Sequence, residues 1–197
     1  MSREMERGIQ DIQTMQRVYL QTIIQPGDMV VDATVGLGRD TAFLADCVGP
    51  QGKVYAFDIQ EEALTATRSL LNEQGLSPRV DLLLASHTYL AQYVPDRVKV
   101  VVFNLGYLPG SDHRVVTEAS TTLEAIQAAI KILKHKGIIW ITVYRGHDAG
   151  MEESQLLINY FSTLSKKDFS VFQGRYINQG ELSPYWIIVQ KNREDIE

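Results

Sequence analysis

A carboxylate and two glycines stand at a spacing that suits the binding of a small molecule at the end of a strand. Residues 29–31 form a short apolar run, and Asp32 follows it directly. Gly36 and Gly38 permit a tight turn and a close approach of the backbone before a helix that we expect to open near Arg39. The alternative is that the two glycines only turn a strand into a helix.

A second carboxylate, Asp58, ends the next apolar run, residues 53–57. A carboxylate there can accept hydrogen bonds from both hydroxyls of a ribose. A dinucleotide site needs a small residue at position 41, where this chain has Thr41, and Asp32 would repel a pyrophosphate. S-adenosylmethionine instead carries a sulfonium and an ammonium group, which pair favourably with a carboxylate. The residues therefore predict S-adenosylmethionine as the cofactor and not a dinucleotide.

The segment that follows the fourth predicted strand, residues 98–103, has the pattern Asn104-x-x-Tyr107. An asparagine oxygen and a backbone carbonyl can accept hydrogen bonds from a target nitrogen, while an aromatic ring stacks on the substrate. The spacing resembles the N-P-P-Y element of amino methyltransferases, with Leu105 and Gly106 in place of the prolines. We expect Asn104 and Tyr107 to be catalytic. The alternative is an asparagine and a buried tyrosine in an ordinary loop.

A protonated amine has no lone pair with which to attack, so the site must bind the neutral amine or remove a proton. His147, after the fifth predicted strand, is our first candidate for the base. His113 and, less readily, Tyr107 are the others. A histidine that is exposed or contacts RNA is the alternative interpretation of His147.

Strand and helix patterns alternate along the chain, which predicts an α/β fold. The expected helices cover residues 9–24, 39–47, 61–74, 117–134 and 151–165. The expected strands cover residues 29–33, 53–58, 80–84, 98–103, 138–143, 168–175 and 184–190. The last two strands have no helix between them, so they must pair antiparallel or leave the sheet.

Two helices carry further signals. Apolar residues recur at helical spacing in the first helix, at Ile12, Met15, Tyr19 and Ile23. Four basic residues stand at the expected end of the helix over 117–134: Lys131, Lys134, His135 and Lys136. Gly137 then stops the helix. They complement the helix dipole or, alternatively, contact RNA.

Composition favours one domain over residues 1–197, with an N-terminal helix, because 197 residues with 45% hydrophobic content can bury a sizeable core. The net charge of −5 argues against a broadly basic surface but allows a local positive face. The single Cys47 excludes an internal disulfide, and the four histidines lie too far apart to predict a metal site. Since no apolar run reaches membrane-spanning length, we expect a soluble, cytoplasmic protein without a membrane segment.

Several motifs together resemble the bacterial rRNA-methylase family of class I methyltransferases over nearly the whole chain. They are Val-Asp-Ala-Thr at 31–34, Phe-Asp-Ile-Gln at 57–60, Ser-His at 86–87, Asn-Leu-Gly-Tyr-Leu-Pro-Gly at 104–110 and Gly-His at 146–147. The resemblance implies a Rossmann-like fold: a seven-stranded, mostly parallel sheet with helices on both faces and an antiparallel last strand. It also implies methylation of wobble 5-aminomethyl-2-thiouridine in tRNA to 5-methylaminomethyl-2-thiouridine.

With the motifs above, the resemblance predicts a cofactor site at the carboxyl ends of the strands. Its expected residues are Asp32, Thr34, Gly36, Gly38, Asp40, Thr41, Asp58, Ile59, Gln60, Ser86, His87 and Asn104. Ser86 and Gln60 could instead cap helices, and Asp40 could stabilise the start of its helix. Leu37 departs from the smaller or polar residue that many relatives have between the glycines.

The substrate-binding residues are expected on the loops at the same edge. They are Gly106, Tyr107, His113, Arg114 and Arg145. The chain has little insertion from which to build a lid, so an open site suits a flipped nucleotide of a tRNA anticodon loop.

Other functions remain open at this stage. The acidic charge favours a small-molecule methyltransferase, and the family also suggests ribosomal RNA as the substrate. A non-catalytic protein that binds S-adenosylmethionine would not need the Asn104-x-x-Tyr107 pattern. The sequence leaves the oligomeric state undecided, with a homodimer among the options.

Overall fold

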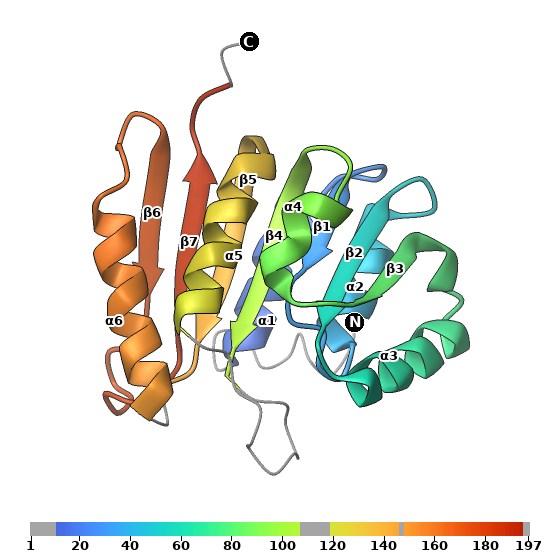
Figure 1. The fold of residues 1–197 in the computed structure, drawn as a ribbon, viewed down its shortest axis with the longest axis horizontal. Coiled ribbons are helices and arrows are strands. Elements are labelled where there is room, and N and C mark those ends of the chain that lie inside the picture. Colours follow the sequence, from blue (N-terminus) through green and yellow to red (C-terminus); the bar gives the residue numbers. More distant parts are fainter. Residues whose placement is uncertain (1–10, 107–118, 146–147, 195–197) are drawn as a thin grey trace.

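The computed structural model describes residues 11–106, 119–145 and 148–194. Seven strands form one sheet in the order β3-β2-β1-β4-β5-β7-β6 (Figure 1). Their bounds are β1 Met29–Asp32, β2 Lys53–Asp58, β3 Val80–Leu84, β4 Val98–Leu105, β5 Leu133–Val143, β6 Phe169–Gly174 and β7 Tyr185–Lys191. The first five strands pair in parallel, and β7 pairs antiparallel with β5 and β6. The expected sheet and its antiparallel last strand are therefore confirmed.

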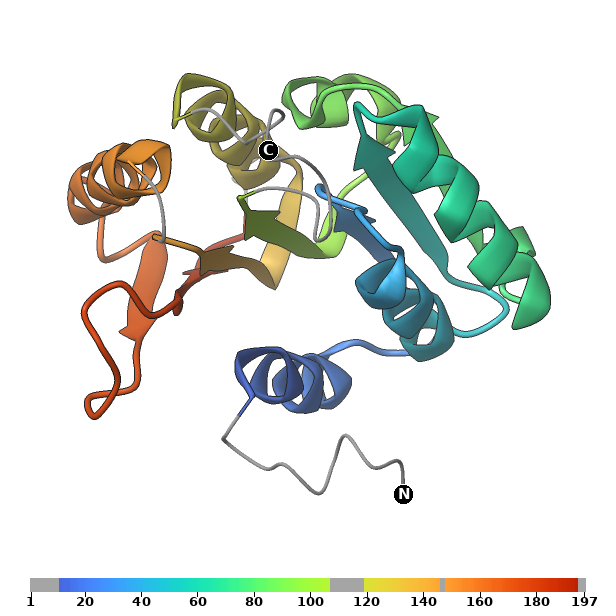
Figure 2. The ribbon, with the colours of Figure 1, turned by 90° about the horizontal axis from the view of Figure 1, so that it is seen from below.

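Helices cover both faces of the sheet, as expected. They are α1 Ile12–Ile23, α2 Arg39–Val48, α3 Glu61–Glu73, α4 Leu90–Tyr93, α5 Ala119–Ile132 and α6 Asp148–Ser162, with short 3-10 helices η2 Ser77–Arg79 and η3 His87–Tyr89. Figure 2 shows α1 and α2 on one side of the sheet and α5 and α6 on the other. Two apolar cores result, one between the sheet and α4 to α6, the other between the sheet and α1 to α3. The central strand β4 is apolar on both faces because it lies between these cores.

The strand order reverses between β1 and β4, the two neighbours at the centre of the sheet. From β1 the chain continues outward to β2 and β3, and then crosses back to β4 on the other side. In open α/β sheets, ligands bind at the carboxyl ends of the strands next to such a reversal. The fold therefore directs attention to the residues that follow β1 and end β4.

Three of the four apolar positions expected in the first helix, Ile12, Met15 and Ile23, are partly buried and pack against the core. Tyr19, the fourth, is 39% exposed, whereas Gln16 and Leu20 are fully buried. The apolar pattern does not mark Gln16, whose buried amide makes hydrogen bonds on both sides. It accepts one from the Thr142 hydroxyl at 3.2 Å and donates one to Asp40 at 3.4 Å.

The boundary between α5 and β5 is a correction to the sequence prediction. The helix ends at Ile132, and the strand begins at Leu133, so the lysines at 134 and 136 belong to the strand and not to a helix end. The pairing with β4 shifts register between Val98 and Val100, and Lys136 has a positive φ of 57°. Gly137 is required for close packing, since a Cβ there would lie 2.8 Å from the Lys134 carbonyl. Lys134 and Lys136 lie at the amino end of β5, opposite the edge where the strand order predicts ligand binding.

Candidate functional site

Asp32 is the last residue of β1 and is completely buried. Its carboxyl group accepts hydrogen bonds from the Thr41 hydroxyl at 2.6 Å and from the Thr34 backbone N–H at 3.2 Å. Burial raises the pKa of Asp32 to about 7, and the negative charges of Asp40 and Asp58 add to this rise. A carboxyl group in such surroundings ionises more readily when a positively charged ligand binds beside it.

The turn after β1 is tied to the end of β2 through Asp58. One carboxylate oxygen accepts the Gly36 N–H at 2.9 Å, and the other accepts the Gln60 N–H at 2.9 Å. Each oxygen keeps a lone pair for a further donor, as the hydroxyls of a ribose would supply. Gly38 has a φ of 74°, and a Cβ at this position would lie 2.5 Å from the Thr67 hydroxyl on α3. The turn therefore requires glycine at position 38 for both conformation and space.

Exposed apolar side chains surround Asp58 at this edge. Leu37 is 41% exposed, Ile59 is 60% exposed and Leu84, the register partner of Asp58 on β3, is 58% exposed. Large apolar side chains that stay in water at a ligand site are suited to packing against a flat base. Sequence reasoning selected Ile59 but missed Leu84, because the last residue of a buried strand shows no pattern that marks it as exposed.

His87, the first residue of η3, presents a buried hydrogen-bond acceptor near the end of β1. Its Nδ1 lies 3.3 Å from the Ala33 carbonyl, to which it donates when that nitrogen is protonated. Burial lowers the pKa of His87, so the neutral ring is favoured, and its buried Nε2 has no partner among the described residues. Ser86 caps η3 by accepting the Thr88 N–H at 3.3 Å, which is the capping role that the sequence left open.

Asn104 stands near the end of β4, next to the turn after β1. Its backbone N–H donates to the Thr34 hydroxyl oxygen at 2.8 Å, and its side-chain Nδ2 donates to Asp40 at 2.9 Å. The Asn104 Oδ1 is buried and has no hydrogen-bond partner in the described part of the chain. It is the kind of acceptor that a target nitrogen requires.

Asp40 connects this asparagine to the first helix. It is only 8% exposed, and it also accepts hydrogen bonds from Gln16 at 3.4 Å and from Arg17 at 3.2 Å. Sequence reasoning missed both α1 residues. A glutamine and an arginine between apolar residues of a helix are typical of a solvent-facing stripe. No local signal in the sequence distinguishes a buried pair from an exposed one.

Arg145 follows β5 at the same edge, and one terminal nitrogen of its guanidinium makes hydrogen bonds within the protein. The group lies over the Tyr185 ring at 5.0 Å and donates to the carbonyls of Glu181 and Ser183. Arg145 therefore holds the connection between β6 and β7 in place, a role that the sequence did not predict.

The structure brings together the expected cofactor residues at the carboxyl ends of β1, β2 and β4 and the start of η3. Thr41, although expected to line the site, is fully buried and acts through Asp32. Gly106 ends the described segment after β4, with a φ of 148°, and a Cβ at this position would lie 3.7 Å from the Tyr144 side chain. Four of the expected residues, Tyr107, His113, Arg114 and His147, lie outside the described residues.

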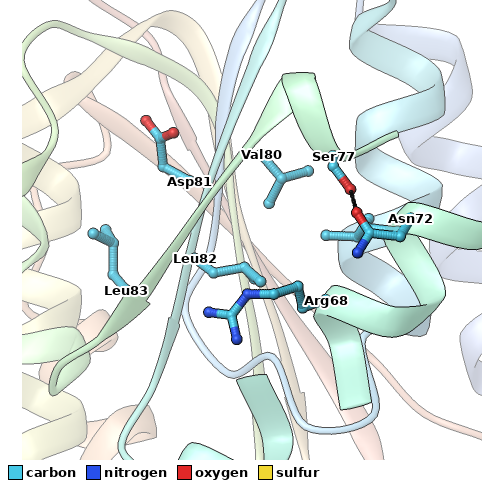
Figure 3. A pocket seen from close by; sticks show the side chains of 8 residues that line it. Arg68, Asn72, Ser77, Val80, Asp81, Leu82 and Leu83 are labelled. Carbon is cyan, nitrogen blue, oxygen red and sulfur yellow. Dashed lines mark hydrogen bonds between the residues drawn. The ribbon is translucent and has the colours of Figure 1, made fainter. Parts of the chain in front are cut away.

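A separate hollow lies along the outer edge of the sheet, between α3 and β3 (Figure 3). Three of its polar side chains have protein partners: Ser77 donates to Asn72 at 2.5 Å, and Asp81 forms an ion pair with Lys53 at 2.7 Å. Because this hollow lacks the orphaned acceptors of the β1–β4 edge, it is a poorer candidate site.

The residues that the structure describes contain neither a metal centre nor a membrane-spanning helix. No group of three or more His, Cys, Asp and Glu side chains there is arranged to hold a metal ion. Within the same ranges, no helix is both long and apolar enough to cross a membrane.

The geometry fits S-adenosylmethionine. Asp58 has lone pairs for ribose hydroxyls, the exposed apolar residues around it suit adenine, and the buried charge of Asp32 favours a cationic ligand. Together with the strand order, these features define an S-adenosylmethionine-dependent methyltransferase of the Rossmann-like class.

Comparison with known proteins supports this class and specifies it further. Residues 54–190 match the family described as "Putative rRNA methylase". A chloroplastic tRNA (mnm(5)s(2)U34)-methyltransferase of Arabidopsis thaliana is 39% identical over 184 residues, which cover 88% of this chain and 67% of that protein. The chain therefore belongs to this family of methylases.

Two solved structures have the same architecture over almost their full length. The rRNA-methylase structure from Clostridium thermocellum has a TM-score of 0.90 and 38% identity, covering 93% of this chain and 98% of its own. A methyltransferase structure from Streptococcus mutans, in complex with SAH, has a TM-score of 0.81 and 32% identity, with 97% and 99% covered. The protein is an S-adenosylmethionine-dependent methyltransferase.

Proposed function

We propose that this methyltransferase transfers the methyl group to the primary amine of 5-aminomethyl-2-thiouridine at the wobble position of tRNA. The observation that carries the proposal is the buried Oδ1 of Asn104, which has no partner among the described residues and stands at the edge where the expected cofactor residues converge. An amine donates hydrogen bonds, so this acceptor suits a nitrogen nucleophile. The Arabidopsis relative, a tRNA (mnm(5)s(2)U34)-methyltransferase that aligns with 88% of this chain, supports the same substrate.

Transfer from a sulfonium to an amine is an in-line displacement, so the main task of the protein is to hold the two reactants in line. The cofactor supplies an electrophilic methyl group. Asn104 accepts a hydrogen bond from the amine and thereby aims its lone pair, while Asp58, Asp32 and His87 hold the other reactant. We assign stacking on the substrate to Tyr107 and removal of the amine proton to His147, both outside the described residues.

The remaining site assignments are part of the same proposal. Thr34, Gly36, Gly38, Ile59, Gln60 and Ser86 form the backbone and rim of the cofactor pocket. We assign Gly106, His113 and Arg114 to binding of the nucleotide. The anticodon loop of tRNA is the proposed partner.

Ribosomal RNA is the second candidate substrate, because the matching family and the Clostridium structure are described as rRNA methylases. A match to a ribosomal RNA small subunit methyltransferase H covers 26% of this chain and 18% of that protein. A match over so small a part of both chains carries no argument for a shared substrate.

The test supplies purified protein and radiolabelled S-adenosylmethionine with three acceptors. These are tRNA carrying the aminomethyl precursor, the same tRNA lacking the modification, and ribosomal RNA. We expect label only in the first, with nucleoside mass spectrometry identifying the methylaminomethyl product. Label in ribosomal RNA, and none in the precursor tRNA, would refute the proposed substrate while leaving the methyltransferase class intact.

A further inference from the structure

We propose that Asp40 is a positioning residue for the methyl acceptor, and that it acts by fixing the orientation of the Asn104 side-chain amide. This inference rests on the proposed function, because it assigns Asn104 to the amine that receives the methyl group. It assigns to Asp40 a role different from the cofactor contact that the sequence predicts. Asp40 and its α1 partners all precede the segment that matches the family, residues 54–190.

The first step of the argument is the polarity of the amide. An asparagine side chain has a donor end and an acceptor end of nearly the same shape, so its orientation depends on its partners. Asp40 is a carboxylate that accepts from Nδ2 at 2.9 Å. Turning the amide over would place Oδ1 against a carboxylate oxygen, and two acceptors would then face each other. Asp40 therefore leaves Oδ1 as the end available to a donor.

The second step is the state of that oxygen. Oδ1 is buried and lacks a partner in the described part of the chain, whereas Nδ2 and the backbone N–H of Asn104 are both engaged. An acceptor that is buried without a partner costs free energy, which a donor from a substrate would recover. The described residues thus hold the backbone N–H and the Nδ2 of Asn104, and they leave its Oδ1 without a donor.

The third step is the support for Asp40 itself. A carboxylate that is 8% exposed needs charged or hydrogen-bonding partners. Arg17 supplies an ion pair at 3.2 Å, and Gln16 donates at 3.4 Å. Gln16 is oriented in turn by the Thr142 hydroxyl, which donates to its Oε1 at 3.2 Å. The first helix therefore belongs to the acceptor site, because it holds the residue that orients Asn104.

A double-mutant cycle tests whether Asp40 acts through Asn104. We compare Asp40→Asn, Asn104→Ala and the double variant, measuring kcat, KM for precursor tRNA and Kd for S-adenosylmethionine. An amide at position 40 can meet either end of the Asn104 amide, so we expect kcat of Asp40→Asn to fall by roughly tenfold. Kd for the cofactor should stay within about twofold. In the Asn104→Ala background, the same change should have no further effect on kcat, which is the strong coupling expected of contacting residues.

A reversed pair provides a rescue that a merely structural role would not show. Asn104→Asp alone places two carboxylates against each other and should abolish turnover. Combined with Asp40→Asn, the donor and the acceptor are exchanged, so the contact is restored and a carboxylate oxygen still faces the amine. We expect this pair to regain at least tenfold in kcat over Asn104→Asp alone.

Asp46→Asn is the matched control, since Asp46 is an exposed carboxylate on the same helix. Its kinetic constants should match those of the wild type. Independent effects of Asp40→Asn and Asn104→Ala on kcat, or a loss of cofactor affinity with kcat unchanged, would overturn the inference.

A final measurement needs no acceptor and separates this inference from the proposed function. The side-chain NH₂ resonances of Asn104 in ¹⁵N spectra should shift in Asp40→Asn and remain in place in Asp46→Asn. If wild-type protein does not methylate the precursor tRNA, the proposed function fails, and the resonances still report whether Asp40 orients the amide. Resonances of Asn104 that do not move in Asp40→Asn would refute the orienting role.

Discussion

The two halves of the site are built in different ways. In the cofactor half, β1, β2 and the turn between them contact one another through residues that are close in sequence. Asp58 accepts from Gln60, two residues away, and from Gly36, which is 22 residues away. In the acceptor half, Asn104 meets Asp40 across 64 residues, and Thr142 meets Gln16 across 126. The contacts of Asp58 therefore span fewer residues than those of the acceptor half.

The two halves also differ in how their polar groups are satisfied. Asp58 is held by two backbone N–H groups, and the φ of 53° at Gly36 favours glycine there. Asp40 is held by the side chains of Gln16, Arg17 and Asn104. Substitutions of these side chains should therefore have strongly coupled effects around Asp40.

The largest effect is expected at Asp32 in the cofactor half, because burial disfavours the ionised form of this carboxyl. The pKa of this carboxyl is about 7 in the folded protein, against 3.8 as the ordinary value. The folded state thus binds more protons than the unfolded state between these values, and the free energy of unfolding falls as pH rises through this window. The loss reaches about 4 kcal/mol above pH 7. Urea unfolding from pH 4 to pH 8, without cofactor, measures it.

Asp32→Asn should remove this decline, whereas Asp46→Asn, on an exposed residue, should preserve it. Because a cation favours the ionised carboxyl, S-adenosylmethionine should bind more tightly to the wild type at pH 8 than at pH 6. A pH dependence of stability that is the same in wild type and Asp32→Asn would show that ionisation of Asp32 does not lower the free energy of unfolding.

The next effect concerns the acceptor half. Asn104→Ala removes the oxygen that aims the amine, so turnover should fall by about 10²-fold to 10³-fold with cofactor affinity unchanged. Single-turnover kinetics and calorimetry on the same preparation measure the two quantities. Asn72→Ala, an exposed asparagine beside the hollow in Figure 3, is the matched control. Normal turnover in Asn104→Ala would remove this residue from the acceptor site.

A smaller effect is expected at Asp58. Asp58→Ala should weaken S-adenosylmethionine binding by about 1.5–3 kcal/mol, through lost charge-assisted hydrogen bonds to the ribose. It also frees the Gly36 N–H, so circular dichroism must show that the variant is folded. Calorimetry that returned the wild-type affinity would exclude Asp58 from the cofactor site.

The smallest effect separates two arginines expected to contact RNA. Arg114→Ala should lower by about one the slope of log affinity for tRNA against log salt concentration. Arg145 is engaged with two carbonyls and the Tyr185 ring, so Arg145→Ala should change that slope by less. Its main effect should be faster proteolysis of the connection between β6 and β7. Equal slope changes in both variants would indicate that Arg145 also binds phosphate.

Much of the fold could be predicted from sequence because strand and helix periods are local. The apolar runs at 29–31, 53–57 and 98–103 locate three parallel strands, and the missing helix before 184–190 predicts the antiparallel strand. The boundary at Leu133 could not be predicted in this way. The segment before Gly137 follows a helical pattern, and only pairing with β4 makes it a strand.

The sequence by itself determined the α/β class and predicted the cofactor motif, because Asp32, the two glycines and Asp58 are recognised by their spacing along the chain. Only the tertiary structure decided which polar side chains meet at the acceptor. Gln16 and Arg17 have the composition of a solvent-facing helix stripe, and their burial against Asp40 follows from how α1 packs on the sheet. Hydrogen bonds between distant side chains depend on packing, which periodicity along the chain does not record.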